Sequence, residues 1–389
     1  MITYKSSSTA TAATKLVLIF GAGYDPIYED QDPIPTGSGT TAQSMGRGIF
    51  IVDAADGSVL WRAGVTGTTT NASVSGMTYA IASDVSALDT NRDGLIDRLY
   101  LGDTGGNIWR VDLADPLAAN WTVNKLASLG YAQSPTNVDR RKFLFRPSVV
   151  PSSDSAGRYD AVLIGSGDRE HPFNGYGDAN HPSSAAVINR FYMLKDRSVG
   201  LGWGIGATGP LATAPVTIVD PGIGNIASDF FDATTTNLGA TVIPVALAAA
   251  KGWFITLANA NSTANGEKVV GTAVTLAGTT FFNTNRPLPP VAGVCQANLG
   301  EARQYAVNFQ NGGAVIDNTV GGGLTLADRY AVHPGGGFLP NPVSVVVNLT
   351  NSSGVTSTKN AICIGTNCTE APGPKYQSRL RTYWFKEME

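Results

Sequence analysis

The sequence is poor in charge, and what charge it has is not clustered. Only 15% of its 389 residues are Asp, Glu, Lys or Arg, against about 25% in an average globular protein, and the net charge is -3. The absence of a basic block argues against nucleic acid as a partner, because such proteins present clustered positive charge. No run approaches the roughly 18 apolar residues of a membrane span, so we expect no transmembrane segment. The 43% hydrophobic content excludes wholesale disorder.

Several signatures of enzymes and metal sites are missing as well. The sequence has no glycine-rich phosphate loop, no dinucleotide-binding fingerprint and no zinc signature. Cys363 and Cys368 are spaced for a small disulfide or for half of a metal site. A zinc site would need two more ligands and only Cys295 remains, so we predict the disulfide, with Cys295 free or paired outside the chain. A disulfide and a composition low in Lys and Glu favour an exported protein.

Short β-type segments make up the chain, with almost no helical periodicity. They are bounded by Gly, Asp, Asn and Pro, and Ala54-Ala-Asp-Gly57 and Asp103-Thr-Gly-Gly106 mark two hairpin turns. We predict strands at 16–21, 48–53, 58–62, 79–87, 98–102, 107–113, 143–149, 159–165, 190–195, 252–257, 267–276, 279–283, 303–309, 314–316, 343–349 and 379–386.

A loose internal repeat runs through these strands. A glycine, an apolar strand, an aspartate and a turn occur at 48–61, and the first half of this unit recurs at 106–113 and 190–196. Such a unit favours a β-propeller, whereas a β-sandwich has similar strands without the repeat. We therefore predict an all-β propeller spanning 1–389, with inserted surface loops at about 64–76, 200–250 and 321–342. Trp61, Trp109 and Trp384 are expected in the core between blades.

The most specific motif is Asp89-Thr-Asn-Arg-Asp-Gly-Leu-Ile-Asp97. Its oxygen-bearing side chains stand at positions 1, 3, 5 and 9 of a calcium loop of the EF-hand type, with glycine at position 6. Alternate residues of a tight loop point inward, so the motif predicts Ca²⁺ as cofactor. The predicted ligands are Asp89, Asn91, Asp93, the Leu95 carbonyl and Asp97.

Two features separate this loop from a helix-loop-helix site. Position 12 is Tyr100 instead of the usual glutamate, and the flanking segments are strands, so we assign the closing role to Asp97. The alternative is an acidic turn that binds no ion and is held by Asx hydrogen bonds.

A second polar segment, Gly165-Ser-Gly-Asp-Arg-Glu-His-Pro172, carries weaker signals. Ser166, Asp168 and His171 could suggest a hydrolase, but the segment lacks the Gly-x-Ser-x-Gly elbow. A metal cluster with Asp178 and His181 is also conceivable, although nothing in the sequence makes these side chains converge. We favour a turn at the end of a blade, with Asp168 paired to Arg169. No catalytic residue is predicted in the chain.

The segment 82–113, which contains the calcium motif, resembles the signature blade of the type IV pilus PilC/PilY family. Segments 18–24, 48–60, 165–172 and 381–385 also fit that family's pattern. The resemblance implies a modified seven-bladed propeller at the C-terminal end of a large exported protein. It also implies a pilus-tip or surface adhesin that associates with minor pilins and supports pilus extension against retraction. In the family, a calcium site of this kind matters for that control. The resemblance implies the same site at residues 89–97.

The chain departs from the family in its extent. The variable N-terminal half is absent, and about sixteen strands make about four blades where closure needs six or seven. We therefore expect part of a longer exported protein, with any surface or host receptor bound through the missing region. The alternative class is a quinoprotein dehydrogenase, since 52–61 also resembles the blade motif of enzymes that bind pyrroloquinoline quinone. The adjacent cysteine pair often found over that quinone is lacking.

Overall fold

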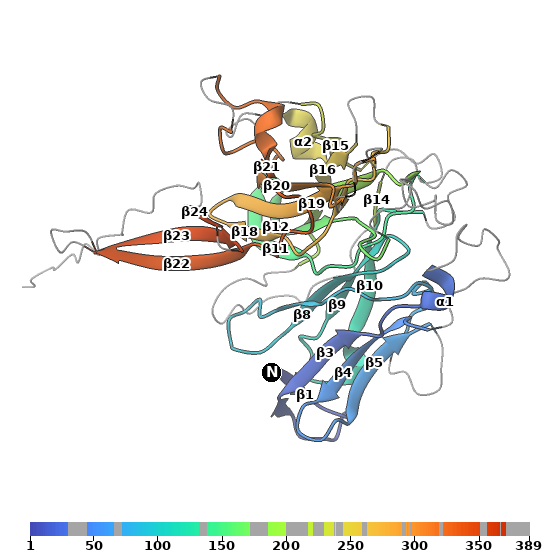
Figure 1. The fold of residues 1–389 in the computed structure, drawn as a ribbon. Helices are drawn as coiled ribbons and strands as arrows, with labels where there is room; N and C mark the ends of the chain where they lie inside the picture. The colour runs from blue at the N-terminus through green and yellow to red at the C-terminus, as the bar shows by residue number, and fades with distance from the viewer. Residues whose placement is uncertain are drawn as a thin grey trace, which may run out of the picture.

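The structure is a computed structural model that places the chain almost wholly in β-strands. It describes residues 1–29, 45–65, 72–131, 138–171, 186–199, 217–220, 229–236, 238, 244–258, 263–289, 293, 295, 298–318, 322–350, 356–365 and 367–370. Within these ranges, sheets of four or five strands follow one another along the chain and stack side by side (Figure 1).

Each of four sheets is built largely from consecutive strands. The first, in the order β3-β4-β5-β6, contains β3 (Val17–Gly21), β4 (Gly48–Asp53), β5 (Val59–Gly64) and β6 (Ala72–Ser73). The second, β14-β10-β9-β8-β7, contains β7 (Ser86–Leu88), β8 (Arg98–Gly102), β9 (Asn107–Asp112), β10 (Thr122–Ser128) and β14 (Ile218–Val219). The third, β11-β12-β13-β16-β15, contains β11 (Ser148–Asp154), β12 (Gly157–Gly165), β13 (Asn189–Asp196), β15 (Phe231–Asp232) and β16 (Gly252–Leu257). The fourth, β17-β19-β20-β21 with β18 also on β19, contains β17 (Lys268–Val269), β18 (Val274–Leu276), β19 (Thr279–Arg286), β20 (Glu301–Asn308) and β21 (Tyr330–His333).

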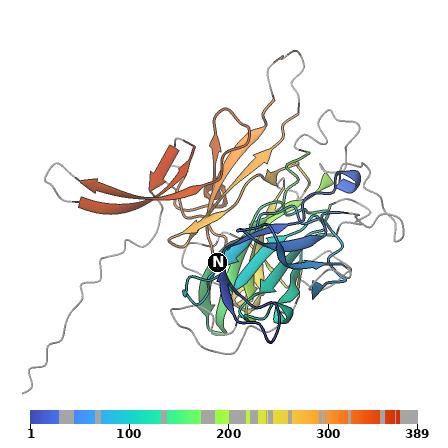
Figure 2. The same ribbon diagram turned by 90° about the horizontal axis from the view of Figure 1, so that it is seen from below.

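The remaining elements lie around these sheets. They are β1 (Ile2–Tyr4), β2 (Ala13–Lys15), β22 (Val343–Thr350), β23 (Thr356–Ile364), β24 (Asn367–Glu370), the helices α1 (Pro26–Glu29) and α2 (Val245–Ala249), and the 3-10 helices η1 (Ala118–Asn120) and η3 (Leu326–Arg329). The β22–β23 hairpin extends away from the stacked sheets, as Figure 2 shows from below. Among the described helices, none has the length and apolar character needed to cross a membrane.

The sheets pack face to face through side chains that alternate along each strand. In β8, Leu99 and Leu101 belong to a cluster with Trp61 of the first sheet, whereas Tyr100 belongs to a cluster with Tyr192 of the third. All five residues of β8 are buried. Successive side chains of a strand point to opposite faces, so a strand covered on both sides has no exposed position. The second sheet is therefore enclosed between its two neighbours.

The same packing continues to the end of the stack. Leu163, Phe191 and Trp253 of the third sheet form one cluster with Phe282 and Tyr305 of the fourth. The opposite face of the fourth sheet packs Phe281 and Ala306 against Ile362 and Ile364 of β23. Apolar sheets stacked in succession are the blades of a propeller, whereas a sandwich consists of two packed sheets.

Several predicted strands match the structure closely, and others are wrong. The predicted strand 79–87 is wrong over most of its length, because only its last two residues enter β7. Ile81 is buried there, but its N–H donates to the Gly46 carbonyl (2.8 Å) and its carbonyl accepts from the Gly23 N–H (3.0 Å), so it joins loops and not a ladder. The strands β4 and β16 match the predicted ranges 48–53 and 252–257.

Other predictions differ by smaller amounts or fall outside the described residues. The predicted strand 143–149 overlaps only the start of β11, and β10, β23 and β24 were not predicted. The described parts of the loops at 64–76, 200–250 and 321–342 contain the short strands β6, β14, β15 and β21, which join the blades, together with α2 and η3. The predicted strand 379–386, and Trp384 with it, lie outside the described residues. Trp61 and Trp109 are buried, as predicted.

The disulfide prediction is confirmed. Cys363 and Cys368 are bonded, with their Cα atoms 4.0 Å apart, and they are a cross-strand pair of β23 and β24. Cys295 is free and exposed. The bond joins the two strands that continue the hairpin packed on the fourth sheet, so it fastens the end of this cover.

Candidate metal centre

The predicted calcium loop connects β7 to β8 at the edge of the second blade. Its C-terminal end is fixed to the strands on both sides, because the Asp97 N–H donates to the Leu88 carbonyl (2.9 Å) and the Asp97 carbonyl accepts from the Leu113 N–H (2.8 Å). The Ile96 N–H donates to the Met1 carbonyl (2.8 Å). The C-terminal end of the loop is thus hydrogen-bonded to the second blade and to Met1.

Three of the predicted ligands lie together in a closed turn. Asp89 accepts from the backbone N–H groups of Asp93 (3.1 Å) and Gly94 (2.8 Å) through its two carboxylate oxygens. Asn91 accepts from the Asp93 N–H (2.9 Å), and Asp93 accepts from the Leu95 N–H (2.8 Å). Gly94 has φ of 89°, a left-handed conformation that favours glycine, as the sequence pattern requires.

The fourth predicted side-chain ligand, Asp97, sits at the base of the loop and faces Thr90. Its carboxylate accepts from the Thr90 N–H (3.1 Å to Oδ2) and from the Thr90 hydroxyl (2.7 Å). Burial raises the pKa of Asp97, and the hydrogen bonds from Thr90 oppose that rise. This contact closes the loop across its two ends.

The donor chemistry of the loop fits calcium. All five predicted donors are oxygen atoms, three of them from carboxylates, which is the set that a hard cation with about 6 to 8 ligands prefers. The side chains themselves are turned to the loop's own N–H groups and to Thr90. Accordingly, no group of three or more His, Cys, Asp or Glu side chains in the described part of the chain is gathered as a metal cluster. The ligand set of residues 89–97 stays a prediction.

The residue that follows the loop enters a buried network of ion pairs between two blades. Arg98 pairs with Asp112 of β9 (3.1 Å) and with Asp160 of the third sheet (2.9 Å). The Tyr100 hydroxyl lies 2.8 Å from a carboxylate oxygen of Asp160 and of Asp196. Arg98, which makes this contact between blades, therefore follows the loop at 89–97 directly in the chain.

The segment at 165–171 does not form a catalytic triad. The Ser166 hydroxyl contacts Asn189 (3.0 Å) and accepts from the Arg190 N–H (3.0 Å), while the Asp168 carboxylate lies 3.0 Å from His171 Nδ1. Serine and histidine thus belong to different contacts. Asp178 and His181, proposed with them as a metal cluster, lie outside the described residues.

The expected Asp168–Arg169 pair is also wrong. Asp168 pairs with Lys142 (2.8 Å), which in turn pairs with Glu29 (2.7 Å), and all three side chains are almost fully buried. Lys142 and His171 hold the pKa of Asp168 well below its usual range, although burial alone would raise it. Arg169 lies over the Phe338 ring instead, 5.2 Å from its centroid. A buried lysine offers Asp168 a stronger partner than a solvated arginine beside it.

Sequence patterns could not find these two charged clusters. Lys142 is 113 positions from Glu29 and 26 from Asp168, and Arg98 is 62 positions from Asp160. No local spacing joins residues that different blades supply. The one available signal was the presence of charged residues inside otherwise apolar strands, such as Asp160 in β12, because a buried charge requires a partner.

Stacked apolar blades and an acidic loop between two strands of one blade define an all-β propeller with a candidate calcium loop. No model of a known protein family matches the chain. The chain is 26% identical over 247 residues to the "Type IV pilus biogenesis factor PilY1 homolog" of Xylella fastidiosa (strain Temecula1 / ATCC 700964), a match over 62% of this chain and 15% of that protein's length. Its fold is similar to the crystal structure of the Pseudomonas aeruginosa PilY1 C-terminal domain, with a TM-score of 0.53 and 17% identity over 85% of this chain and 68% of that one. These findings confirm the resemblance to the PilC/PilY family and the propeller fold.

A europium-containing methanol dehydrogenase is similar at a TM-score of 0.33 and 12% identity, over 82% of this chain. That level of likeness carries no conclusion about function.

Proposed function

We propose that this chain is the calcium-binding propeller of an exported type IV pilus-associated protein. It acts at the pilus tip, the cell surface, or the outer membrane and periplasm, where it supports pilus extension against retraction, twitching motility and surface adhesion. The names of the similar proteins support this proposal: one is a pilus biogenesis factor and the other a PilY1 C-terminal domain. The chain spans 15% of the length of the first of these proteins. The partners of the whole protein, named below, are therefore also proposed.

The observation that carries the calcium part is the position of the loop between β7 and the buried network at Arg98. When bound, Ca²⁺ would supply positive charge that offsets the mutual repulsion of the three carboxylates. Asp89, Asn91 and Asp93 would hold the ion with the Leu95 carbonyl, and Asp97 would close the site. Asp97 and Leu88 keep the two ends of the loop together, so the chain enters β8 with Arg98 aimed at Asp160.

The proposed role of the site is structural, without catalysis. Extracellular calcium modules bind with dissociation constants of about 10⁻⁴ to 10⁻³ M, and a surface protein meets calcium in that range. A site of this affinity is filled outside the cell and empty in a low-calcium compartment. The minor pilins at the pilus tip are the proposed partners, and any host or surface receptor binds through other regions of the longer protein.

Thermal unfolding with and without calcium tests the metal part. A ligand at a hundredfold excess over its dissociation constant, bound to the folded state alone, adds about 2.7 kcal/mol to the free energy of unfolding. Millimolar Ca²⁺ should therefore raise the melting temperature above its value in excess chelator, and Asp93→Ala should abolish the rise. Asp56→Ala is the matched control, because Asp56 is also an exposed turn aspartate that accepts a backbone N–H (from Ser58, 2.9 Å). A wild-type melting temperature that ignores calcium would refute the calcium site.

A second experiment tests the pilus part separately. In a bacterium that carries the gene, Asp93→Ala and Asp56→Ala are placed in the chromosomal copy, and sheared surface pili are quantified in calcium and in chelator. The proposal expects fewer surface pili with a deletion of the gene, and an altered calcium dependence with Asp93→Ala alone. Unchanged piliation in the deletion would refute the pilus role and leave the calcium result intact.

A further inference from the structure

Thr90 occupies the second position of the candidate calcium loop, and its contacts differ from those of the predicted ligands. It is 3% exposed, whereas Asp93 and Gly94, further along the loop, are exposed. The Thr90 hydroxyl donates to Asp97 Oδ2 (2.7 Å), and the Thr90 N–H lies 3.2 Å from Oδ1 and 3.1 Å from Oδ2 of the same carboxylate. The backbone and the side chain of one buried residue therefore both hold Asp97.

Asp97 is the acid on which closure of this loop depends. Three of the four predicted side-chain ligands come from the first five positions of the loop, and Asp97 alone stands at the other end. Position 12, where a glutamate closes an EF-hand loop, is Tyr100. The Tyr100 hydroxyl lies 2.8 Å from buried carboxylates of the third sheet, so it belongs to the contact between blades. How well an ion is enclosed therefore depends on the direction of the Asp97 carboxylate.

The hydrogen bonds from Thr90 leave Asp97 able to bind an ion. A carboxylate has about four lone-pair sites on its two oxygens, which is more than the two donor groups of Thr90 use. The backbone of Asp97 is fixed separately, by Leu88 and Leu113, so the Thr90 hydroxyl acts on the direction of the side chain. Carboxylates that ligate metal ions in proteins are commonly held by a hydrogen bond from a residue that does not touch the ion.

We propose that Thr90 is a positioning residue of the calcium site, whose hydroxyl holds the Asp97 carboxylate in the direction that closes the ligand shell. The inference rests on the calcium site proposed above and adds to it a residue that does not touch the ion. Without the hydroxyl, the Asp97 carboxylate turns more freely, while the ligands at the other end of the loop keep their own contacts. Calcium should then bind about 10 to 100 times more weakly, the usual effect of losing such a contact.

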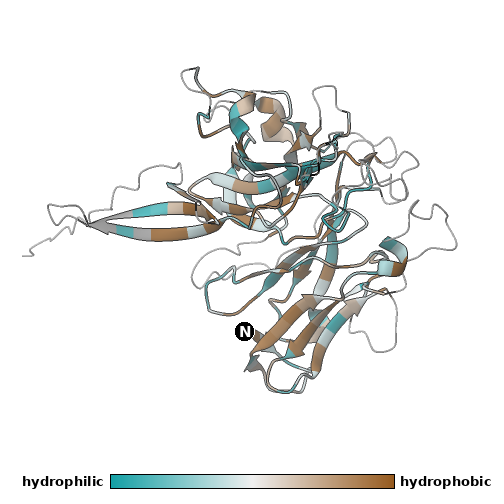
Figure 3. Ribbon diagram, in the orientation of Figure 1, coloured by the Kyte–Doolittle hydropathy of each residue, from teal (hydrophilic) through white to brown (hydrophobic). Residues whose placement is uncertain are grey.

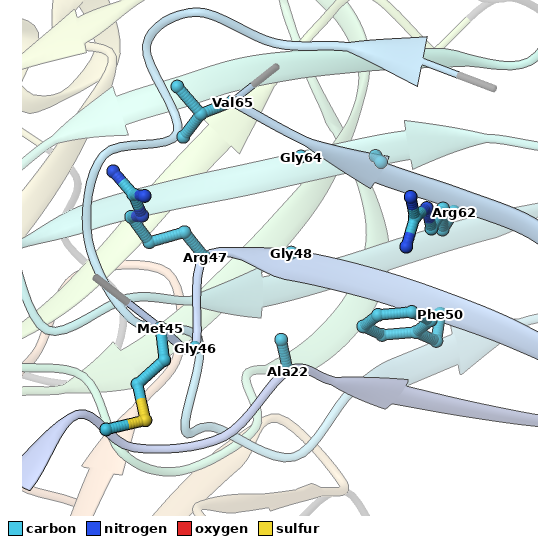
Figure 4. A pocket seen from close by; sticks show the side chains of 10 residues that line it. Ala22, Met45, Gly46, Arg47, Gly48, Phe50, Arg62, Gly64 and Val65 are labelled. Atoms are coloured by element: carbon cyan, nitrogen blue, oxygen red, sulfur yellow. The ribbon is translucent and has the colours of Figure 1, made fainter. Parts of the chain in front are cut away.

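The pocket of the first blade is not expected to compete for calcium. Strands of this blade show mostly hydrophobic colouring (Figure 3). The pocket at their end has a volume of about 260 Å³, and none of its described lining residues is acidic. Arg47 and Arg62 flank it from two sides (Figure 4). Because calcium prefers several oxygen ligands, with carboxylates among them, a titration of the whole chain should not detect binding at this pocket.

Calorimetric titration of the whole chain with Ca²⁺ tests the proposal with three variants. Thr90→Val removes the hydroxyl and keeps the branched shape and the backbone N–H, so its dissociation constant should be about 10 to 100 times that of the wild type. Thr90→Ser restores a hydroxyl and should bind calcium as tightly as the wild type. Thr284→Val is the matched control, because Thr284 is also buried and its hydroxyl donates to a carboxylate, Glu267, at 2.7 Å in the fourth sheet. It should leave the calcium affinity unchanged.

A merely structural role for Thr90 would give a different result. Thr90→Val would then lower the melting temperature in excess chelator, as Thr284→Val should, and bind calcium with the affinity of the wild type. That outcome, or weak binding that Thr90→Ser does not restore, would overturn the proposal and leave the calcium site intact. A folded wild type that binds no calcium would refute the site itself and this inference with it. Circular dichroism checks folding, and Thr90→Ala, which also lacks the hydroxyl, replaces Thr90→Val if the valine prevents folding.

Discussion

Arg98 on β8 and Asp160 on β12 form a buried ion pair that joins the second blade to the third. Arg98 Nη1 lies 2.9 Å from Asp160 Oδ2, and the two residues are 4% and 0% exposed. Arg98 is the residue that directly follows the candidate calcium loop in the chain. It therefore links the geometry of that loop to the packing between blades.

Removing one member of this pair should be strongly destabilising. Arg98→Met removes a buried cation from beside the Asp160 carboxylate, so we expect the free energy of unfolding to fall by about 3 to 5 kcal/mol in urea denaturation. The exposed pair of Lys359 and Glu370 (2.7 Å) is the control, and Lys359→Met should change stability by at most about 1 kcal/mol. Equal effects of the two substitutions would show that burial does not set the strength of the Arg98 pair.

Adding Asp160→Asn to Arg98→Met provides a second check. The asparagine removes the buried negative charge that faced Arg98, so the double variant should lose less stability than the sum of the two single variants. Simple additivity would mean that Arg98 and Asp160 contribute independently.

The disulfide should protect two of the three cysteines from alkylation. In the folded, unreduced protein, mass spectrometry should find the label on Cys295 alone. After reduction, Cys363 and Cys368 should also react, and the free energy of unfolding should fall by about 2 to 3 kcal/mol at most, because the closed loop is short. Labelling of all three cysteines without reductant would contradict the bond.

Lys268 should make stability rise with pH from about pH 8 upward. Burial lowers its pKa from 10.5 to about 8. Between those values the unfolded chain holds a proton that the folded chain has lost, so the free energy of unfolding increases by up to about 1.4 kcal/mol per pH unit. Below pH 8 the lysine is charged in both states and its contribution to the slope vanishes.

Urea denaturation at several pH values between 8 and 9.5 measures this slope, below the range in which tyrosines ionise. Lys268→Met should flatten it, whereas Lys251→Met, at a side chain 42% exposed and paired with Asp229, should not. An unchanged slope in Lys268→Met would mean that the buried lysine keeps an ordinary pKa.

Sequence patterns predicted those structural features whose residues lie close together in the chain, such as turns and loops. The β4–β5 hairpin is bracketed by a turn in which the Gly57 N–H donates to the Asp53 carbonyl (2.9 Å) at a φ of 77°, and the sequence marks that turn. The loop at 89–97 was recognisable because its oxygen-bearing side chains recur at fixed positions within nine residues. The predicted strand at 79–85 was wrong for a physical reason. Ile81 is buried as a strand residue would be, but its backbone hydrogen bonds are to loop residues.

The contacts between blades had no comparable signal. Glu29, Lys142 and Asp168 come from three separate parts of the chain and meet only in the folded protein. The exposure of Leu18 and Phe20 on β3 could not be predicted from the sequence either. Leu18 and Phe20 alternate with Val17 and Ile19 in a run that is apolar throughout, so the sequence does not show which face is open.

Calorimetric titration of the whole chain with Ca²⁺ measures binding at residues 89–97 directly. We predict one ion bound per chain by the wild type and by Asp56→Ala, with a dissociation constant at or below the millimolar range, and no binding by Asp89→Ala or Asp93→Ala. Calcium binding that survives in both loop variants, or its absence in a folded wild-type protein, would contradict a calcium site at residues 89–97.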